Sequence, residues 1–390
     1  MSMTDLAPFT FMHSTHRILY APGALDRLAE EAEGAGAAKA FVLMDGFFIG
    51  GPLEERVATL LKPLAPVFHA VPQHEPDTDT VGAAAEALRE SGADLVVAIG
   101  GGSALDTAKA ARMLVSNPGP IEDIVGPMGR PMRPHPSLFA CVPTTAGTGS
   151  EVSESAIVAK AGTDYKMVLR NPNMGARLAI LDPELSVSAP AMVTASAGYD
   201  AVTHAVEAFT SNFASAMTDP FAESAMRLLA RHLETAVTEP ENLEARGACL
   251  VGAMQAGIAF NSANLGLAHA IAGALGALHH TPHGLANALG LPWTMTFNEP
   301  ALGPKGPLLA EIFGGETAGH GLSRLRHAIA LDLSLDREAE GADALDRIAD
   351  GAAKSGQIKM NPRPADAAQI RVILEHMRTP TGGARPHLNL

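Results

Sequence analysis

One stretch of this 390-residue chain, from Gly247 to Asn298, contains no Asp, Glu, Lys or Arg. A run of this length could cross a bilayer more than once. However, polar side chains such as Gln255 and Asn261 interrupt the run, and hydrocarbon would leave them without hydrogen-bond partners. We therefore expect helices buried at the centre of a folded domain, and no membrane partner.

The overall charge and the cysteines narrow the class of protein further. The chain carries 28 Lys and Arg against 42 Asp and Glu, a net charge of −14 at pH 7. Nucleic-acid binding depends on clustered Lys and Arg that release counterions, so we expect no nucleic-acid partner. The cysteines, Cys141 and Cys249, both lie in apolar surroundings, which is typical of free thiols in a reducing compartment. The N-terminus lacks a basic start followed by an apolar run, so we expect a cytoplasmic protein.

The two halves of the chain differ in their hydrophobic pattern. In residues 1–190, short apolar runs alternate with helical segments, which predicts an α/β domain with a parallel sheet and helices on both faces. In residues 191–390, Ala, Leu, Glu and Met recur at helical spacing, which predicts an all-helical domain. The strands are expected at residues 40–46, 67–72, 94–102 and 138–143, with further β-type pieces around AIVAK, KMVLR and LAILDPEL.

Two glycine-rich segments follow predicted strands. In the first, Gly100, Gly101 and Gly102 turn the chain, and Ser103 is expected to be the N-cap of the next helix. Glycines let backbone amides approach a diphosphate, and a helix N-terminus favours an anion, although an ordinary tight turn uses the same residues. The second segment, PTTAGTGSE at residues 143–151, would place Thr and Ser hydroxyls after a neighbouring strand. Together the two segments indicate a dinucleotide site.

Asp45 ends the predicted strand AFVLMD. A carboxylate at such a strand end can accept hydrogen bonds from both hydroxyls of an adenosine ribose and would repel a 2′-phosphate, which favours NAD over NADP. An Asp that caps the next turn would give the same pattern.

A second group of residues has the composition of a metal site. Asp200 and His204 stand four residues apart in a helical run, so both side chains project from one face. The charge-free stretch adds His269, His279, His280 and His283. A histidine in so apolar a run is paired, buried neutral or bound to a metal. One carboxylate and three neutral imidazoles suit a divalent ion such as Fe, Zn or Mn and leave a position for a substrate oxygen.

These motifs, taken in order over nearly the whole chain, resemble those of the iron-dependent (group III) alcohol dehydrogenase family. GGGSALDTAK resembles the family's GGGSxxDxAK signature, and PTTAGTGSEV resembles its PTTxGTGSEV segment. DAVTHAVEAFTS, GLAHAIAGALGALHHTPHG and NPRPADAAQI resemble three later family segments. The resemblance implies an N-terminal NAD-binding α/β domain, a C-terminal all-helical metal-binding domain and an active site in the cleft between them.

The resemblance also assigns roles to individual residues. It implies four metal ligands: Asp200, His204, His269 and His283. It implies cofactor contacts in the first glycine-rich signature and in the second polar segment: Gly100, Gly101, Gly102, Ser103, Asp106, Thr144, Thr145 and Thr148. Asp45 matches an aspartate associated with NAD preference, Lys166 matches a lysine near the nicotinamide ribose, and Leu185 matches an apolar cofactor contact.

One position departs from the family pattern. Many relatives carry a histidine four residues after the third metal ligand, and this chain has Gly273 there. We hypothesise that the pocket takes a bulkier or more polar substrate. Water, a cofactor ribose hydroxyl, His279 or His280 would then complete the proton path.

The expected reaction is reversible hydride transfer between NAD(H) and a small primary or secondary alcohol or aldehyde, with Fe(II), or alternatively Zn or Mn, as the Lewis acid. The alternative is a hydroxyacid-oxoacid transhydrogenase, or another enzyme of the same family like glycerol dehydrogenase or maleylacetate reductase, with a polar or anionic substrate. The resemblance further implies a homodimer.

Overall fold

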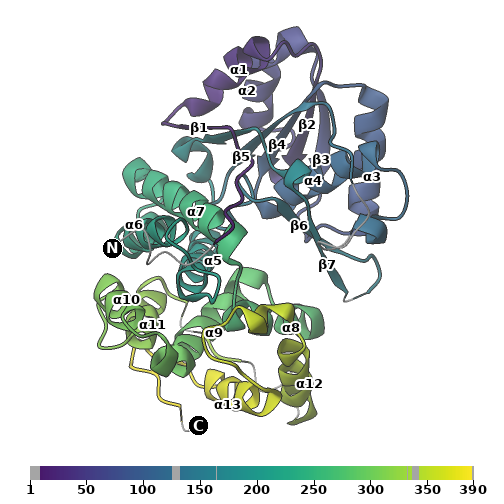
Figure 1. The fold of residues 1–390 in the computed structure, drawn as a ribbon. Helices are drawn as coiled ribbons and strands as arrows, with labels where there is room; N and C mark the ends of the chain where they lie inside the picture. The colour runs from purple at the N-terminus through teal and green to yellow at the C-terminus, as the bar shows by residue number, and fades with distance from the viewer. Residues whose placement is uncertain (1–8, 125–131, 164, 332, 336–341, 389–390) are drawn as a thin grey trace. The chain divides into compact units, whose positions relative to one another are not determined.

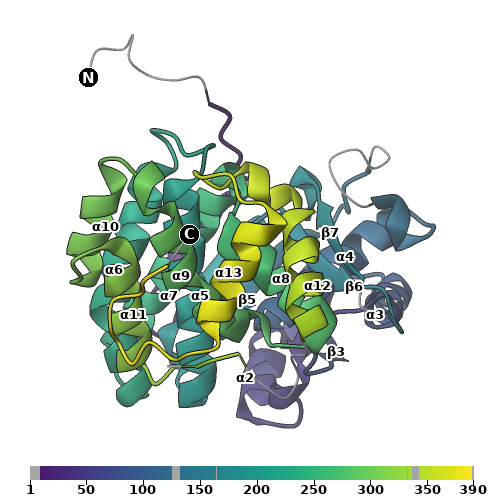
Figure 2. The same cartoon turned by 90° about the horizontal axis from the view of Figure 1, so that it is seen from below.

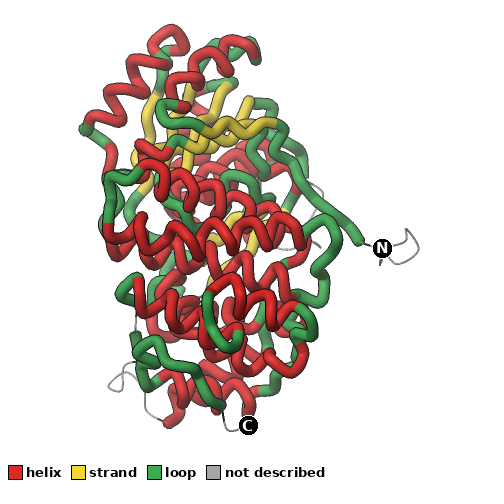
Figure 3. The backbone as a smooth tube through the Cα atoms, turned by 90° about the vertical axis from the view of Figure 1, so that its left-hand side faces the viewer, coloured by secondary structure: helices red, strands yellow, loops and turns green. Residues whose placement is uncertain are grey.

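The computed structural model describes residues 9–124, 132–163, 165–331, 333–335 and 342–388. The chain separates into two compact units, one of residues 12–189 and one of residues 190–390 together with the start of the chain up to Phe11. The first unit holds the strands and the second is helical (Figures 1 and 3). The predicted fold class, a parallel α/β domain followed by a helical domain, is confirmed.

The α/β unit is built on a six-stranded sheet with the strand order β1-β8-β5-β4-β2-β3. Every neighbouring pair in this sheet is parallel. Its strands are β1 (Arg17–Tyr20), β2 (Ala40–Asp45), β3 (Val67–Val71), β4 (Leu95–Gly100), β5 (Leu138–Pro143) and β8 (Leu178–Leu181). The inner strands are apolar apart from Asp45 at the end of β2, because helices cover both faces. Since the strands are parallel, β2, β4 and β5 end at the same edge of the sheet.

Helices cover the two faces of this sheet (Figure 1). On one face, α1 (Leu28–Gly34) and α2 (Pro52–Leu60) pack with alternate strand residues such as Val42 and Val97. On the other face, α3 (Thr78–Ser91) and α4 (Gly102–Ser116) pack with the intervening residues, such as Phe41 and Val96. This alternation is the two-residue period of a strand that is buried on both sides.

A separate antiparallel pair, β6 (Ser155–Ala159) and β7 (Lys166–Arg170), follows the second glycine-rich segment. Its inner residues, including Val158 and Met167, pack with Met113 of α4. The AIVAK and KMVLR segments thus form a hairpin against α4.

The helical unit contains α5 (Ala191–Thr210), α6 (Asp219–Thr238), α7 (Leu243–Ala263), α8 (Leu267–His279), α9 (His283–Asn298), α10 (Lys305–Phe313), α11 (Ala318–Ala328), α12 (Ala342–Ala353) and α13 (Ala367–Met377). One core cluster joins α8, α9, α12 and α13, three of which lie side by side in Figure 2 (α8, α12 and α13).

The charge-free stretch forms most of α7, the whole of α8 and the whole of α9. Many of its side chains are buried in this unit. Within the described ranges, no single helix is long and apolar enough to cross a membrane. The pair α7 and α8, bent by 98°, passes the same test when taken together, by length and composition only.

Helix α9 contains a proline, Pro292, and a buried arginine compensates for it. Pro292 has no N–H, so it cannot donate to the carbonyl of Ala288 four residues earlier. Arg326 of α11, only 1% exposed, donates from Nη1 to that carbonyl oxygen at 3.0 Å, and from Nη2 to Thr381 Oγ1 at 2.8 Å. Arg326 thus links Thr381, in the segment after α13, to the backbone of α9.

Replacing this arginine is expected to destabilise the helical unit. Arg326→Met would leave the Ala288 carbonyl buried without a donor, and the free energy of unfolding should fall by about 2–4 kcal/mol. Urea unfolding followed by circular dichroism measures the change. Arg231→Met, at an exposed position on α6, is the matched control and should change stability by less than about 0.5 kcal/mol. Equal stability of the two variants would contradict the role assigned to Arg326.

Candidate metal centre and cofactor site

Four side chains of the helical unit converge on one point. Asp200, His204, His269 and His283 each offer one donor atom, and these atoms all lie within 4.8 Å of one another. Asp200 Oδ2 is 3.9 Å from His204 Nε2, and Asp200 Oδ1 is 3.7 Å from His283 Nε2. The imidazoles of His204 and His269 stack with ring centroids 4.8 Å apart. Residues separated by up to 83 positions in the chain therefore form a single cluster.

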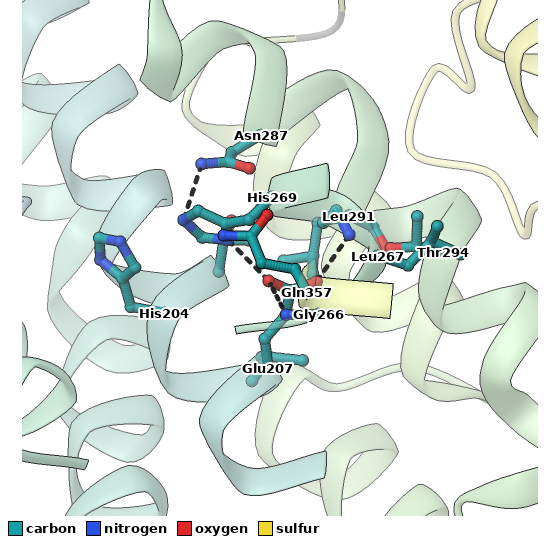
Figure 4. A network of polar contacts seen from close by, with 12 residues as sticks. His204, Glu207, Gly266, Leu267, His269, Asn287, Leu291, Thr294 and Gln357 are labelled. Carbon is teal, nitrogen blue, oxygen red and sulfur yellow. Dashed lines mark hydrogen bonds and ion pairs between the residues drawn. The ribbon is translucent and has the colours of Figure 1, made fainter. Parts of the chain in front are cut away.

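Helix α5 positions two of these donors and a second carboxylate, Glu207, that supports the site. Asp200 and His204 lie on successive turns, and Glu207 follows on the next turn, 2% exposed. Glu207 Oε2 accepts a hydrogen bond from His269 Nδ1 at 2.6 Å and from the Gly266 backbone N–H at 2.9 Å (Figure 4). With its Nδ1–H donated to Glu207, His269 presents the lone pair of Nε2 to the cluster.

The same carboxylate caps the N-terminus of α8. Glu207 Oε1 accepts from the Ala268 backbone N–H, which has no partner inside the helix. A carboxylate at a helix N-terminus also interacts favourably with the helix dipole. Glu207 therefore fixes both the start of α8 and the imidazole that this helix carries.

The fourth donor depends on a close approach between α5 and α9. His283 is the first residue of α9, and Gly284 follows it. A Cβ at Gly284 would lie 2.6 Å from the Ser196 carbonyl oxygen of α5, so only glycine fits here. His283 is the most accessible of the four, with 43% of its side chain exposed. Solvent thus reaches the cluster on the His283 side.

The cluster fits a divalent cation. Burial by itself would raise the pKa of the Asp200 carboxyl, but His204, His283, His269 and a hydrogen bond from Asn287 lower it overall. Asp200 is thus an anion at neutral pH, and the imidazoles are the nitrogen ligands that first-row divalent metals prefer. The Asn287 amide also directs its hydrogens into the cluster, which marks a point that attracts positive charge.

His279 lies apart from this cluster. It is the last residue of α8, ten positions after His269, so the helix rise separates the two by about 15 Å. Its Nε2 is buried and has no hydrogen-bond partner among the described residues. A part for His279 in proton transfer stays a prediction.

In the α/β unit, the edge where β2, β4 and β5 end brings the predicted cofactor residues together. Gly100 ends β4 with φ +150°, and a Cβ there would lie 2.8 Å from the Cβ of Asp45. The Thr144 backbone N–H donates to the Gly100 carbonyl at 3.0 Å. Thr148 packs on Gly102, where a Cβ would lie 2.6 Å from its methyl group. The two glycine-rich segments and Asp45 are therefore neighbours.

The start of α4 differs from the prediction in one respect. Ser103 is not the N-cap; the helix begins at Gly102, and Gly101 is the N-cap, with extended φ and ψ. Ser103 lies in the first turn because Gly101 makes the turn out of β4, so that the helix begins two residues earlier than expected. No side chain of the described residues hydrogen-bonds to this N-terminus as a cap.

Asp106 and a buried lysine join α4 to the second segment. Asp106 accepts from Ser150 Oγ at 2.6 Å and from the Ile157 backbone N–H at 2.9 Å, so both of its oxygens have protein partners. Lys109, fully buried, donates to Ser150 Oγ at 2.7 Å and to Ser153 Oγ at 3.0 Å. These contacts indicate that Asp106 acts by holding the two segments together.

The remaining predicted cofactor residues lie in the same unit. Lys166 of β7 donates to Glu75 Oε1 at 2.7 Å. Leu185 is buried in a 3₁₀ turn, Pro183–Ser186, after β8. Thr145 Oγ1 would be 3.5 Å from a Cβ at Gly101. Asp45 Oδ1 accepts from the Phe47 backbone N–H at 2.9 Å, which is the turn-capping contact that the sequence left open.

The roles of Glu207, Asn287 and Lys109 were not predicted from the sequence. Each had a signal in the pattern. Glu207 is the second acidic residue of the helical run that carries Asp200 and His204, and Asn287 follows His283 by one turn. Lys109 belongs to the first signature, but its partners lie more than 40 residues away in the chain.

Comparison with known proteins agrees with this geometry. Residues 15–183 match the family described as iron-containing alcohol dehydrogenase. Residues 194–377 match the C-terminal part of the Fe-containing alcohol dehydrogenase family. The chain is 37% identical over 367 residues to a probable alcohol dehydrogenase, EutG, of Salmonella typhimurium, covering 89% of each chain.

Solved structures give the same result. The structure of a 1,3-propanediol oxidoreductase aligns with a TM-score of 0.88 and 30% identity, covering 95% of this chain and 100% of that one. Sulfoacetaldehyde reductase from Bifidobacterium kashiwanohense, solved in complex with NAD+, aligns with a TM-score of 0.88 and 25% identity, over 95% and 99% of the two chains. The fold and the matches define an oxidoreductase. The chain belongs to the iron-containing alcohol dehydrogenase family.

A buried carboxyl in the second glycine-rich segment gives a pH-dependent prediction. Burial raises the pKa of Glu151 to about 7, although its backbone hydrogen bond and Lys109 oppose the shift. Because this pKa lies above the ordinary value of 4.5, Glu151 stabilises the fold most at low pH, and the contribution is lost as the pH rises through about 7. The loss amounts to about 3 kcal/mol.

Glu151→Gln removes the titration and keeps a neutral side chain of the same size. The fall in free energy of unfolding between about pH 5 and pH 8 should be smaller in this variant than in the unmodified protein. Urea unfolding at the two pH values measures it. Glu55→Gln, at an exposed position, should leave the pH dependence unchanged. An unchanged pH dependence in Glu151→Gln would show that the buried carboxyl does not titrate in this range.

Proposed function

We propose that this protein catalyses reversible hydride transfer between NAD(H) and a small primary or secondary alcohol or aldehyde. The observation that carries the proposal is the convergence of Asp200, His204, His269 and His283 in the helical unit. Family membership implies a divalent metal and NAD(H), and one aligned relative is solved with NAD+. We propose Fe(II) as the metal, with Zn or Mn as alternatives, because the donor set alone accepts all three.

The chain's own residues would divide the work between binding and orientation. A bound divalent ion would supply Lewis acidity toward the alcohol or carbonyl oxygen, and the cofactor would supply or accept the hydride. Asp200 and the three histidines would hold the ion, and Glu207 fixes the tautomer of His269.

In the α/β unit, the residues at the sheet edge would bind the cofactor. The backbone N–H groups at the start of α4 and the hydroxyls of Thr145 and Thr148 would bind the diphosphate. The Asp45 carboxylate would accept hydrogen bonds from the adenosine ribose and select NAD over NADP. We propose direct cofactor contacts also for Lys166 and Leu185. Asp106 would instead act through its bonds to Ser150 and Ile157.

An anionic or polar substrate is the second candidate. It is favoured by the alignment with a relative named sulfoacetaldehyde reductase. The absence of Asp, Glu, Lys and Arg between residues 247 and 298 means that any cation for such a substrate would come from outside this stretch. We also propose a homodimer, as the family resemblance implies, and a cytoplasmic location, because both cysteines are buried free thiols.

The first test measures metal and turnover together. Protein purified without oxygen should contain one equivalent of Fe, Zn or Mn by elemental analysis. It should oxidise NADH, and NADPH much more slowly, with small neutral or anionic aldehydes. Asp200→Asn should lose both metal and activity, because the site loses its one anionic donor. Metal with no turnover of any aldehyde would favour the transhydrogenase, and no metal under any condition would contradict the four-ligand assignment.

Gly273 provides a test of substrate size. It is exposed on α8 one turn after His269, and a Cβ there would meet no atom within 4 Å. Gly273→His should therefore fold and fill this space. We expect kcat/KM for bulky aldehydes to fall by about tenfold or more relative to small ones, as when a side chain fills part of a pocket.

Gly273→Ala is the control for this change, because it raises helix propensity without filling the space. It should leave the ratio of kcat/KM values for bulky and small aldehydes unchanged. The same ratio in Gly273→His would remove the hypothesis that the glycine widens the pocket.

A further inference from the structure

The Asn287 side chain lies in the middle of the four-donor cluster. Its Nδ2 donates a hydrogen bond to Asp200 Oδ1 at 2.6 Å. The same nitrogen is 3.1 Å from His269 Nε2 (Figure 4). It is also 3.2 Å from His283 Nε2. Asn287 is fully buried and follows His283 by one turn of α9. One amide nitrogen therefore contacts three of the four donors.

The nitrogen of the Asn287 amide has hydrogen-bond partners, whereas its oxygen has none among the described residues. An amide nitrogen carries two hydrogens, and here it has three acceptors within reach. The Oδ1 of the same amide is buried and has no hydrogen-bond partner among the described residues. An unpaired buried carbonyl is unfavourable, so its presence needs a compensating interaction. The contacts of Nδ2 with the cluster are that interaction.

We propose that Asn287 is a positioning residue of the metal centre, whose amide hydrogens hold Asp200, His269 and His283 in their binding arrangement before an ion is present. The inference rests on the proposed metal site. Without a cation, lone pairs of several donors face the same point and repel one another in a medium of low dielectric constant. Amide hydrogens at that point replace the repulsion with hydrogen bonds. A bound ion would take the place of these amide hydrogens as the partner of the imidazoles.

Removing the donor tests the proposal without any measurement of catalysis. Asn287→Leu keeps a side chain of similar length and removes both amide hydrogens. Co²⁺ affinity of the metal-free protein, measured by competition with a chromophoric chelator, should fall by about 10–100-fold, as for other changes behind metal ligands. The visible Co²⁺ spectrum should change as well, because the donors are no longer held in place. If Asn287→Leu has the same Co²⁺ affinity and the same Co²⁺ spectrum as the unmodified protein, the proposal is overturned.

A second variant keeps the shape and reverses the electrostatics. Asn287→Asp places a second buried carboxyl beside Asp200, so the metal-free cluster must either hold two like charges or keep a proton that a bound cation would displace. We expect a lower Tm without metal and a larger Co²⁺-induced rise in Tm than in the unmodified protein. A space-filling role for Asn287 predicts the same rise in both proteins, and that result would overturn the proposal even if Asn287→Leu does not fold.

The matched control is another buried asparagine, in the other unit. Asn117 bonds the Met113 carbonyl at 2.9 Å and the Arg133 backbone N–H at 2.8 Å. Asn117→Leu should lower the Tm and leave Co²⁺ affinity unchanged. Unmodified protein that binds no Co²⁺ would contradict the proposed metal site itself. Co²⁺ binding that is equal in unmodified protein and in Asn287→Leu would contradict only the role of Asn287.

Discussion

The buried carboxylate of Glu207 is the interaction on which the helical unit depends. Its two oxygens accept hydrogen bonds from His269 Nδ1 and from the backbone N–H groups of Gly266 and Ala268. A buried charge is costly unless it is fully hydrogen-bonded, and here three donors meet that requirement. The start of α8 and the orientation of its imidazole are therefore determined by one side chain of α5. Asn361, of the NPRP segment, adds a contact from Oδ1 to the Leu267 N–H at 3.3 Å.

The α/β unit follows a different constraint, the shared direction of its strands. Because β2, β4 and β5 are parallel neighbours, Asp45, Gly100 and Thr144 follow one another along a single edge. The second glycine-rich segment is held at this edge by Lys109, which donates hydrogen bonds to the hydroxyls of Ser150 and Ser153. The helical unit thus organises its site by side-chain contacts between helices, whereas the α/β unit combines the parallel strand topology with the side-chain bonds of Lys109 and Asp106.

The features that depend on local periodicity could be predicted from the sequence. The apolar runs at residues 40–46 and 94–102 correspond to buried parallel strands, and the four-residue spacing of Asp200 and His204 places both on one face of α5. Strand β1 escaped prediction because RILY is an edge strand that carries the polar Arg17 and is partly exposed. Ser103 was misplaced as an N-cap because the turn at Gly101 depends on backbone angles that glycine leaves open.

Contacts between residues that are far apart in the sequence could not be predicted from local periodicity. Glu207 acts on a helix that begins 60 residues later, and Asn287 contacts Asp200 across 87 positions. Nothing in the spacing of these residues specifies which helices will pack together, so their roles appear only once α5, α8 and α9 are in contact. The resemblance to a known family supplied the ligand set, but not the side chains that hold it.

The bond between Arg326 and Thr381 has a consequence for synthesis of the chain. All strands of the large sheet lie before residue 182, so the α/β unit has its complete framework while translation continues. In helix α9, by contrast, the Ala288 carbonyl accepts a hydrogen bond from Arg326. Arg326 also donates a hydrogen bond to Thr381, which comes after α13 in the chain. The helix that carries His283 therefore gains its full set of these contacts only after Thr381 has been synthesised, well after the sheet of the α/β unit.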